Sequence, residues 1–119
     1  MDEIEILNNF LSGALKKESK HRYRSLIQTK KGQIKFLKSL CHQFEDKIND
    51  LKVINELPIE VWKLSSLLFS ERDGFGIVVN NFKTAFQKSE DSCLIVDYSG
   101  KFGIYKPESM VDDIKYIAL

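Results

Sequence analysis

Cysteine and histidine are scarce in this sequence, which has only two of each among its 119 residues. The two histidines lie far apart in the sequence and no Cys/His motif with zinc-ligand spacing is present, so we expect no metal site, and no motif indicates a cofactor. Cys41 and Cys93 lie on predicted core elements, which favours reduced thiols and a cytoplasmic protein over a disulfide. A chain of this length can bury a hydrophobic core without a disulfide or a metal.

Long apolar runs are absent as well, since none approaches the ~20 residues of a membrane-spanning helix. The first residues are acidic and lack the basic and apolar segments of a secretory signal, so we expect neither a signal peptide nor a membrane partner. The hydrophobic share of 43% and the charged share of 29% are those of an ordinary globular protein. The length predicts a single domain over residues 1–119.

The formal net charge is only +1, but the basic residues are unevenly distributed. Residues 16–38 contain nine lysines or arginines and one glutamate, whereas the rest of the chain has nine basic and sixteen acidic residues. Such a one-sided segment raises the local potential and attracts anions. Two interpretations remain open: a solvated helical face balanced by acidic residues elsewhere, or a binding surface.

Residues 30–48 show the clearest helical pattern. One predicted face is apolar and consists of Ile34, Leu37, Leu40, Cys41, Phe44 and Ile48. A separate stripe, with the i, i+4, i+7, i+11 spacing that stacks side chains along a helix, consists of Lys31, Lys35, Lys38 and His42. With two residues of the preceding helix, this stripe makes up the candidate binding face: Arg22, Arg24, Lys31, Lys35, Lys38 and His42.

Helical patterns dominate the first part of the chain and strand patterns the second. Helices are predicted over residues 3–17, 20–29, 30–48 and 58–69, the last with Trp62 in the core. Residues 70–76 are a predicted loop, followed by a strand over 75–80 and one or two helical turns near Phe82. Two strands over 92–98 and 101–106 are joined by the turn signal Ser99-Gly100.

The last ten residues fit two structures. Ser109 and Asp112 resemble a capping box, which favours a helix, whereas residues 114–119 alternate in a way that favours a strand, and we favour the strand. Helices first and strands later indicate the α+β class, with about four N-terminal helices packed on a small C-terminal antiparallel sheet.

Residues with catalytic chemistry are present without a catalytic pattern. The candidates are His21, His42, Cys41, Cys93, Glu71, Asp73 and Asp97. Cys41 and His42 point about 100° apart on a helix and form no ready-made dyad. The segment Asp73-Gly74-Phe75-Gly76 lacks the preceding strand and the following Lys-Ser/Thr of a phosphate loop, so we expect a flexible turn. The sequence favours a protein that is not an enzyme.

A short pattern resembles one found in some small uncharacterised bacterial proteins. It consists of His21-Arg22-Tyr23-Arg24, Lys31-Gly32, Lys35-Phe36-Leu37, Leu40 and His42, and near the C-terminus of Ser92-Cys93, Gly100-Lys101-Phe102 and Tyr105. The resemblance covers roughly half of the chain with short motifs. It implies a bacterial α+β protein and supplies no catalytic residues.

The leading hypothesis is a small non-catalytic binding module, such as an adaptor, inhibitor or immunity-like protein, that holds an acidic protein partner on the basic face of residues 20–42. One alternative is a nucleic-acid-binding accessory protein, because Tyr23 and Phe36 lie among the basic residues. Another is an enzyme with a site near residues 70–76. The oligomeric state stays open.

Overall fold

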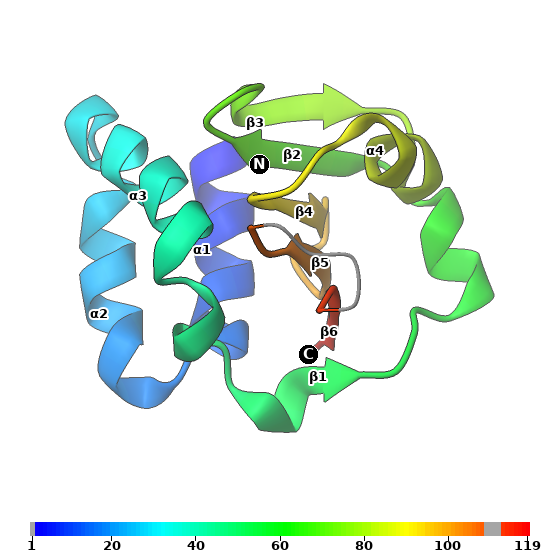
Figure 1. Cartoon of the computed structure of the whole chain (residues 1–119), viewed down its shortest axis with the longest axis horizontal. Helices are drawn as coiled ribbons and strands as arrows, with labels where there is room; N and C mark the ends of the chain where they lie inside the picture. The colour runs from blue at the N-terminus through cyan, green and yellow to red at the C-terminus, as the bar shows by residue number, and fades with distance from the viewer. Residues whose placement is uncertain (1, 109–112) are drawn as a thin grey trace.

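A computed structural model describes residues 2–108 and 113–119, and it confirms the α+β class (Figure 1). The α-helices are α1 (Glu3–Ala14), α2 (Lys17–Leu26), α3 (Lys30–His42) and α4 (Phe82–Lys88). The strands are β1 (Val53–Ile54), β2 (Ser66–Ser70), β3 (Gly74–Val79), β4 (Cys93–Asp97), β5 (Phe102–Lys106) and β6 (Lys115–Ala118). Three 3₁₀ helices, Glu45–Lys47, Asp50–Lys52 and Ile59–Lys63, lie between α3 and β2. Within the described residues, no helix is long and apolar enough to cross a membrane.

The six strands form one sheet in the order β1-β6-β5-β4-β2-β3, and all neighbouring strands are antiparallel. Helices α1, α2 and α3 pack together beside the sheet, and α4 lies apart from them (Figure 1). Each face of the sheet has its own core. The first contains α1–α3 residues with Leu67 and Phe69, and the second contains α4 residues with Leu68 and Ile95.

Aromatic rings fill the first core. Tyr23, Phe36 and Phe44 contact one another edge to face, with ring centroids 5.8–6.0 Å apart. Phe44 also contacts Tyr105 of β5 at 5.1 Å. Edge-to-face pairs suit the charge distribution of the rings and add to the free energy gained by burial. This cluster fixes the positions of α2 and α3 relative to the sheet.

The β4–β5 hairpin confirms the predicted turn. Gly100 has φ +71°, a conformation that glycine adopts without strain. The buried Asp97 carboxylate accepts hydrogen bonds from the backbone N–H groups of Ser99, Lys101 and Phe102 at 2.8–3.0 Å. Asp97 therefore stabilises the turn. Strand β6 confirms the predicted C-terminal strand, and the suggested capping box of Ser109 and Asp112 lies outside the described residues.

The register predicted for α3 is partly wrong. The helix ends at His42 instead of near residue 48, and Ile34 is 57% exposed, whereas Phe36 is fully buried. Ile34 and Phe36 lie about 200° apart on a helix, so only one can face the core, and the larger aromatic ring does. Buried as predicted are Leu37, Leu40, Phe44 and Ile48, with Cys41 partly buried. Because the chain leaves the helix at Gln43, the 3₁₀ turn that follows places Phe44 and Ile48.

The predicted helix over residues 58–69 is also wrong. It begins as the 3₁₀ helix Ile59–Lys63 and continues as β2, a central strand. A short apolar run fits a strand buried on both faces as well as a buried helix, so periodicity alone does not decide. Trp62 is partly buried and packs on Phe86 and Tyr116, with ring centroids 5.5 and 6.2 Å apart. Helices α1 and α2 end three residues earlier than predicted, at Ala14 and Leu26.

The predicted loop over residues 70–76 is a tight β2–β3 turn, because β2 reaches Ser70 and β3 starts at Gly74. The pairing of these strands shifts by one residue beside Gly76, which has φ +75°. Leu68 pairs with Ile77 and Phe69 with Phe75, so Gly76 is the extra residue of a β-bulge. The bulge lies on β3, an edge strand of the sheet.

Candidate functional site

The basic residues lie on a hairpin of two helices, in which α2 and α3 run antiparallel (Figure 1). Thr29 begins α3, and its side-chain oxygen accepts a hydrogen bond from Gly32 N–H at 3.0 Å. A Cβ atom at Gly32 would lie 1.9 Å from the Leu26 carbonyl oxygen. Only glycine therefore allows the first turn of α3 to approach the end of α2 this closely.

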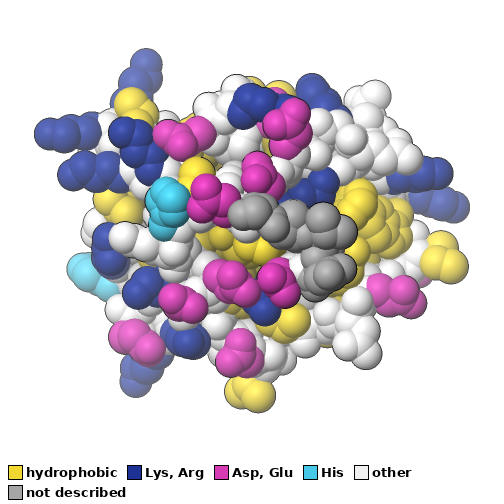
Figure 2. Space-filling view, viewed as in Figure 1, with side chains coloured by type: hydrophobic (Ala, Val, Ile, Leu, Met, Phe, Trp, Pro, Cys, Tyr) yellow, Lys and Arg dark blue, Asp and Glu magenta, His cyan; other side chains and the backbone are white. Residues whose placement is uncertain are grey.

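Two adjoining hollows follow this helical hairpin and share Arg22, Leu26 and Lys35. Their volumes are about 400 and 280 Å³. The first is also lined by Ser25, Thr29, Lys31 and Gly32, and the second by Lys38, Ser39, His42 and Gln43. We call the two hollows together the α2–α3 groove. No acidic side chain is found among the described residues that line it, and lysine and arginine side chains gather over these helices in Figure 2.

The structure brings five of the six predicted site residues together in the groove: Arg22, Lys31, Lys35, Lys38 and His42. All five are exposed. Arg24 lies elsewhere, because residues two positions apart on a helix point to nearly opposite sides. Its Nε donates to the Asn8 Oδ1 of α1 at 3.3 Å, and it lines a separate hollow with Lys17, Lys20 and His21.

The positive charge of the groove is largely unpaired. Within residues 2–108 and 113–119, the only contact of this kind between a groove residue and a carboxylate joins His42 Nδ1 to Glu108 Oε2 at 3.2 Å. Arg22 lies over the Tyr23 ring, 5.9 Å from its centroid. Among the described residues, no carboxylate forms an ion pair with Arg22, Lys31, Lys35 or Lys38, so these charges raise the local potential and attract anions.

The aromatic residues near the groove are not available to a ligand. Tyr23 and Phe36 are both 0% exposed, since their rings pack into the first core. Stacking of nucleic-acid bases needs an accessible aromatic face. The observation that favoured a nucleic-acid partner in the sequence is thus a feature of the core.

Sequence reasoning missed Ile34 as a surface residue. Its helical neighbours at i−4, i−3 and i+4 are Lys30, Lys31 and Lys38, all exposed. The sequence does contain an indication: Ile34 and Phe36 lie on opposite sides of the helix, so only one of them can face the core, and the larger aromatic ring does. The result is an exposed aliphatic side chain surrounded by lysines.

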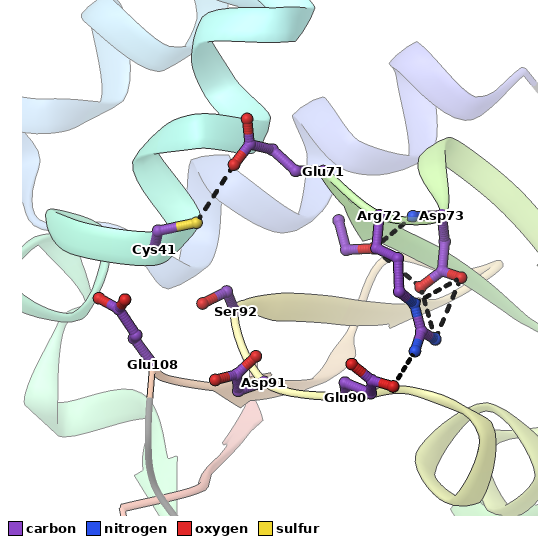
Figure 3. Close-up of a pocket in the computed structure, with 9 residues that line it drawn as sticks. Cys41, Glu71, Arg72, Asp73, Glu90, Asp91, Ser92 and Glu108 are labelled. Carbon is purple, nitrogen blue, oxygen red and sulfur yellow. Dashed lines mark hydrogen bonds and ion pairs between the residues drawn. The ribbon is translucent and has the colours of Figure 1, made fainter.

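A further hollow of about 270 Å³ lies where the β2–β3 turn, the segment before β4 and the end of β5 meet α3 (Figure 3). It is lined by Cys41, Ser70, Glu71, Arg72, Asp73, Glu90, Asp91, Ser92 and Glu108. Arg72 is paired with Asp73 at 3.2 Å and with Glu90 at 2.5 Å. The carboxylates outnumber this arginine, so the pocket is acidic. We call it the acidic pocket.

The acidic pocket holds the cysteine predicted as a candidate nucleophile. The Cys41 thiol donates to Glu71 Oε1 at 3.5 Å (Figure 3). Burial raises the pKa of this thiol, and Glu71 raises it further, although a hydrogen bond with Ser92 lowers it in part. A protonated thiol is a weak nucleophile, and the described lining residues include no histidine or lysine that could act as a base.

The remaining candidates are dispersed. Cys93 is a free, buried thiol in β4, and burial raises its pKa. His21 lies on α2, and Asp97 stabilises the β4–β5 turn. In the described part of the chain, no cluster of three or more His, Cys, Asp or Glu side chains could hold a metal ion. Comparison with known proteins gives no match among protein-family models, curated proteins or solved structures.

Proposed function

We propose that this protein is a non-catalytic binding module that holds an acidic segment of a partner protein in the α2–α3 groove. The supporting observation is a row of four exposed cations, Arg22, Lys31, Lys35 and Lys38, without a carboxylate partner among the described residues. A single exposed ion pair contributes only about 0–1 kcal/mol. A row of them speeds association with an anionic partner and selects against cationic ones.

The surroundings of the groove favour a short anionic ligand. At the His42 end of α3, the contact of His42 with Glu108 joins the groove to the acidic pocket, where Glu71 and Asp91 add further negative charge. Figure 2 shows acidic side chains gathered next to the basic region. A long polyanion that continued past α3 would meet this charge and be repelled. An acidic protein segment that ends within the groove would not.

A nucleic-acid partner is the second candidate, because phosphates suit the same cations. The full burial of Tyr23 and Phe36 removes the stacking surface that a single strand would use. We also propose a cytoplasmic location, since the two free thiols, Cys41 and Cys93, fit a reducing compartment.

The test compares two variants, one that neutralises three lysines in the groove and one that neutralises three lysines elsewhere on the molecule. The groove variant is Lys31→Gln/Lys35→Gln/Lys38→Gln. The matched control, Lys63→Gln/Lys83→Gln/Lys88→Gln, removes the same charge from exposed lysines of the Ile59–Lys63 3₁₀ helix and α4. Fluorescence anisotropy would measure the binding of a labelled acidic peptide, with glutamates at i, i+4 and i+7, and of a labelled single-stranded oligonucleotide.

We expect the groove variant to bind the peptide roughly tenfold more weakly and with a weaker salt dependence, and the control variant to bind like the parent. Melting temperatures of all three proteins should agree, because the replaced lysines are exposed. Equal affinity and salt dependence for the parent and the groove variant would mean that the basic stripe is only a solvated helical face.

A further inference from the structure

The aliphatic surface beside the lysine stripe carries one more inference, which rests on the proposed function. We infer that the partner segment is amphipathic: its carboxylates pair with the lysine stripe, and one of its apolar side chains packs on Ile34. Ile34 is 57% exposed and lies on α3 among Lys30, Lys31 and Lys38. Its side chain offers an apolar contact on a surface that is otherwise charged.

The position of Ile34 follows from the geometry of α3. Lys31, Lys35 and Lys38 lie within a narrow arc, and Ile34 lies about 60° from Lys31, on the side away from α2. The described residues that line the groove on the α2 side accordingly include these lysines but not Ile34. Across the surface, the order is Arg22 and Leu26 in the groove, then the lysine stripe, then Ile34. A segment lying along the stripe therefore covers Ile34 with its outer edge.

The chemistry of this pair of features selects the class of partner. A phosphodiester backbone would pair with the lysines but offers no apolar side chain to Ile34. An acidic segment with a leucine, isoleucine, valine or methionine satisfies both. Interfaces between proteins combine apolar and charged contacts.

The spacing of the cations favours a helical segment. Lys31, Lys35, Lys38 and His42 follow i, i+4, i+7, i+11 and extend over about 16 Å at 1.5 Å per residue. Carboxylates at the same spacing on a second helix would face them in register, with an apolar residue at an adjacent position reaching Ile34.

Single exposed apolar side chains are common on protein surfaces, and another isoleucine of this chain provides the control. Ile59 is 80% exposed at the start of the Ile59–Lys63 3₁₀ helix, away from the groove. Replacement of Ile34 or Ile59 by alanine removes the same atoms from the surface. Neither change should disturb the fold, and the melting temperature would verify this.

The experiment is a double-mutant cycle with two acidic helix-forming peptides of equal length and charge. One has a leucine between its glutamates, and the other has glutamine in its place. We expect Ile34→Ala to weaken binding of the leucine peptide roughly five- to tenfold and to leave the glutamine peptide unchanged. Ile59→Ala should change neither affinity, and the triple lysine variant of the groove should weaken both.

The outcomes separate the two proposals. If Ile34→Ala affects both peptides equally or neither, while the triple lysine variant weakens both, Ile34 does not pack on the apolar residue of the segment and only the charge-based proposal stands. If the triple lysine variant has no effect either, both proposals fail. An oligonucleotide that binds more tightly than both peptides, and whose binding the lysine variant weakens, would overturn the inference of an amphipathic protein segment.

Discussion

The Tyr105 hydroxyl of β5 donates a hydrogen bond to the Leu40 carbonyl oxygen in the last turn of α3, at 2.5 Å. Carbonyl groups in the last turn of a helix lack the usual partner within the helix, and here the Phe44 N–H bonds to Ser39 instead. Both Tyr105 and Leu40 are buried, so water does not replace the bond. The sheet thereby positions the end of the helix that holds the basic stripe.

Tyr105→Phe should therefore destabilise the protein although it preserves the ring. We expect a loss of about 1–3 kcal/mol in the free energy of unfolding, because a buried carbonyl loses its donor. Urea denaturation monitored by circular dichroism would measure it. Tyr98→Phe, at a position 41% exposed after β4, is the control and should change stability little. Equal stability of the two variants would show that the Tyr105 hydrogen bond contributes nothing.

The register of α3 predicts that Phe36 and Ile34, two positions apart, contribute very differently to stability. Phe36→Ala should cost about 3–5 kcal/mol, since the ring is fully buried between Tyr23, Phe44 and Phe69. Ile34→Ala should stay within about 0.5 kcal/mol, because its side chain faces solvent. Thermal and urea unfolding would report both values. If Ile34→Ala lowered the free energy of unfolding more than Phe36→Ala does, this register of α3 would be wrong.

A sequence pattern predicts the fold only where it fits a single type of secondary structure. The change from helical to alternating periodicity and the Ser99-Gly100 turn signal each fit one structure, and the α+β class and the β4–β5 hairpin follow. The run Leu67-Leu68-Phe69 fits both a buried helix and a buried strand, and only its pairing with β3 and β4 decides. Local patterns contain no information on that pairing.

The candidate site divides in the same way. Exposure of Lys31, Lys35 and Lys38 follows from their stripe and is confirmed. The separation of Arg24 from Arg22 also follows from helical geometry, once each is placed on a face. The acidic pocket includes residues of the segment 70–76 that the sequence offered as an alternative site. Its other lining residues could not be predicted, because they come from segments that are distant in sequence and meet only in the fold.

The reactivity of Cys41 should depend on pH and on Glu71. Because burial and Glu71 raise the pKa of this thiol, we expect slow alkylation by iodoacetamide near neutral pH and faster alkylation only at a pH above the usual range of a cysteine thiol. Glu71→Gln removes one cause of the raised pKa and should speed the reaction at a fixed pH. Mass spectrometry of the labelled peptide would measure the rate.

Glu60→Gln is a control for this reaction, since Glu60 is exposed and is not one of the residues that line the pocket. Cys93 should stay unlabelled in the folded protein because it is fully buried. If Cys41 reacts at the rate of an exposed thiol at pH 7, and Glu71→Gln does not change that rate, its surroundings do not raise the pKa of the thiol.

The close contact of α2 and α3 predicts a specific effect of a small substitution. Gly32→Ala would place a Cβ against the Leu26 backbone oxygen, which cannot move without displacing a helix. We expect a loss of about 1–3 kcal/mol in the free energy of unfolding. In Gly13→Ala, the control, the atoms nearest to the new Cβ belong to the end of the Leu119 side chain, which can shift more easily than backbone. If both variants were equally stable, the Gly32 contact would not set the spacing of the helices.

The bulge at Gly76 has a consequence for self-association. Strand β3 is an open edge with exposed Ile77 and Val78 and no charged residue, which is the kind of strand that aggregates by pairing with a copy of itself. The extra residue interrupts the regular row of outward backbone donors and acceptors, and its φ of +75° bends the strand. We therefore expect deletion of Gly76 to straighten this edge and to promote edge-to-edge association at high concentration.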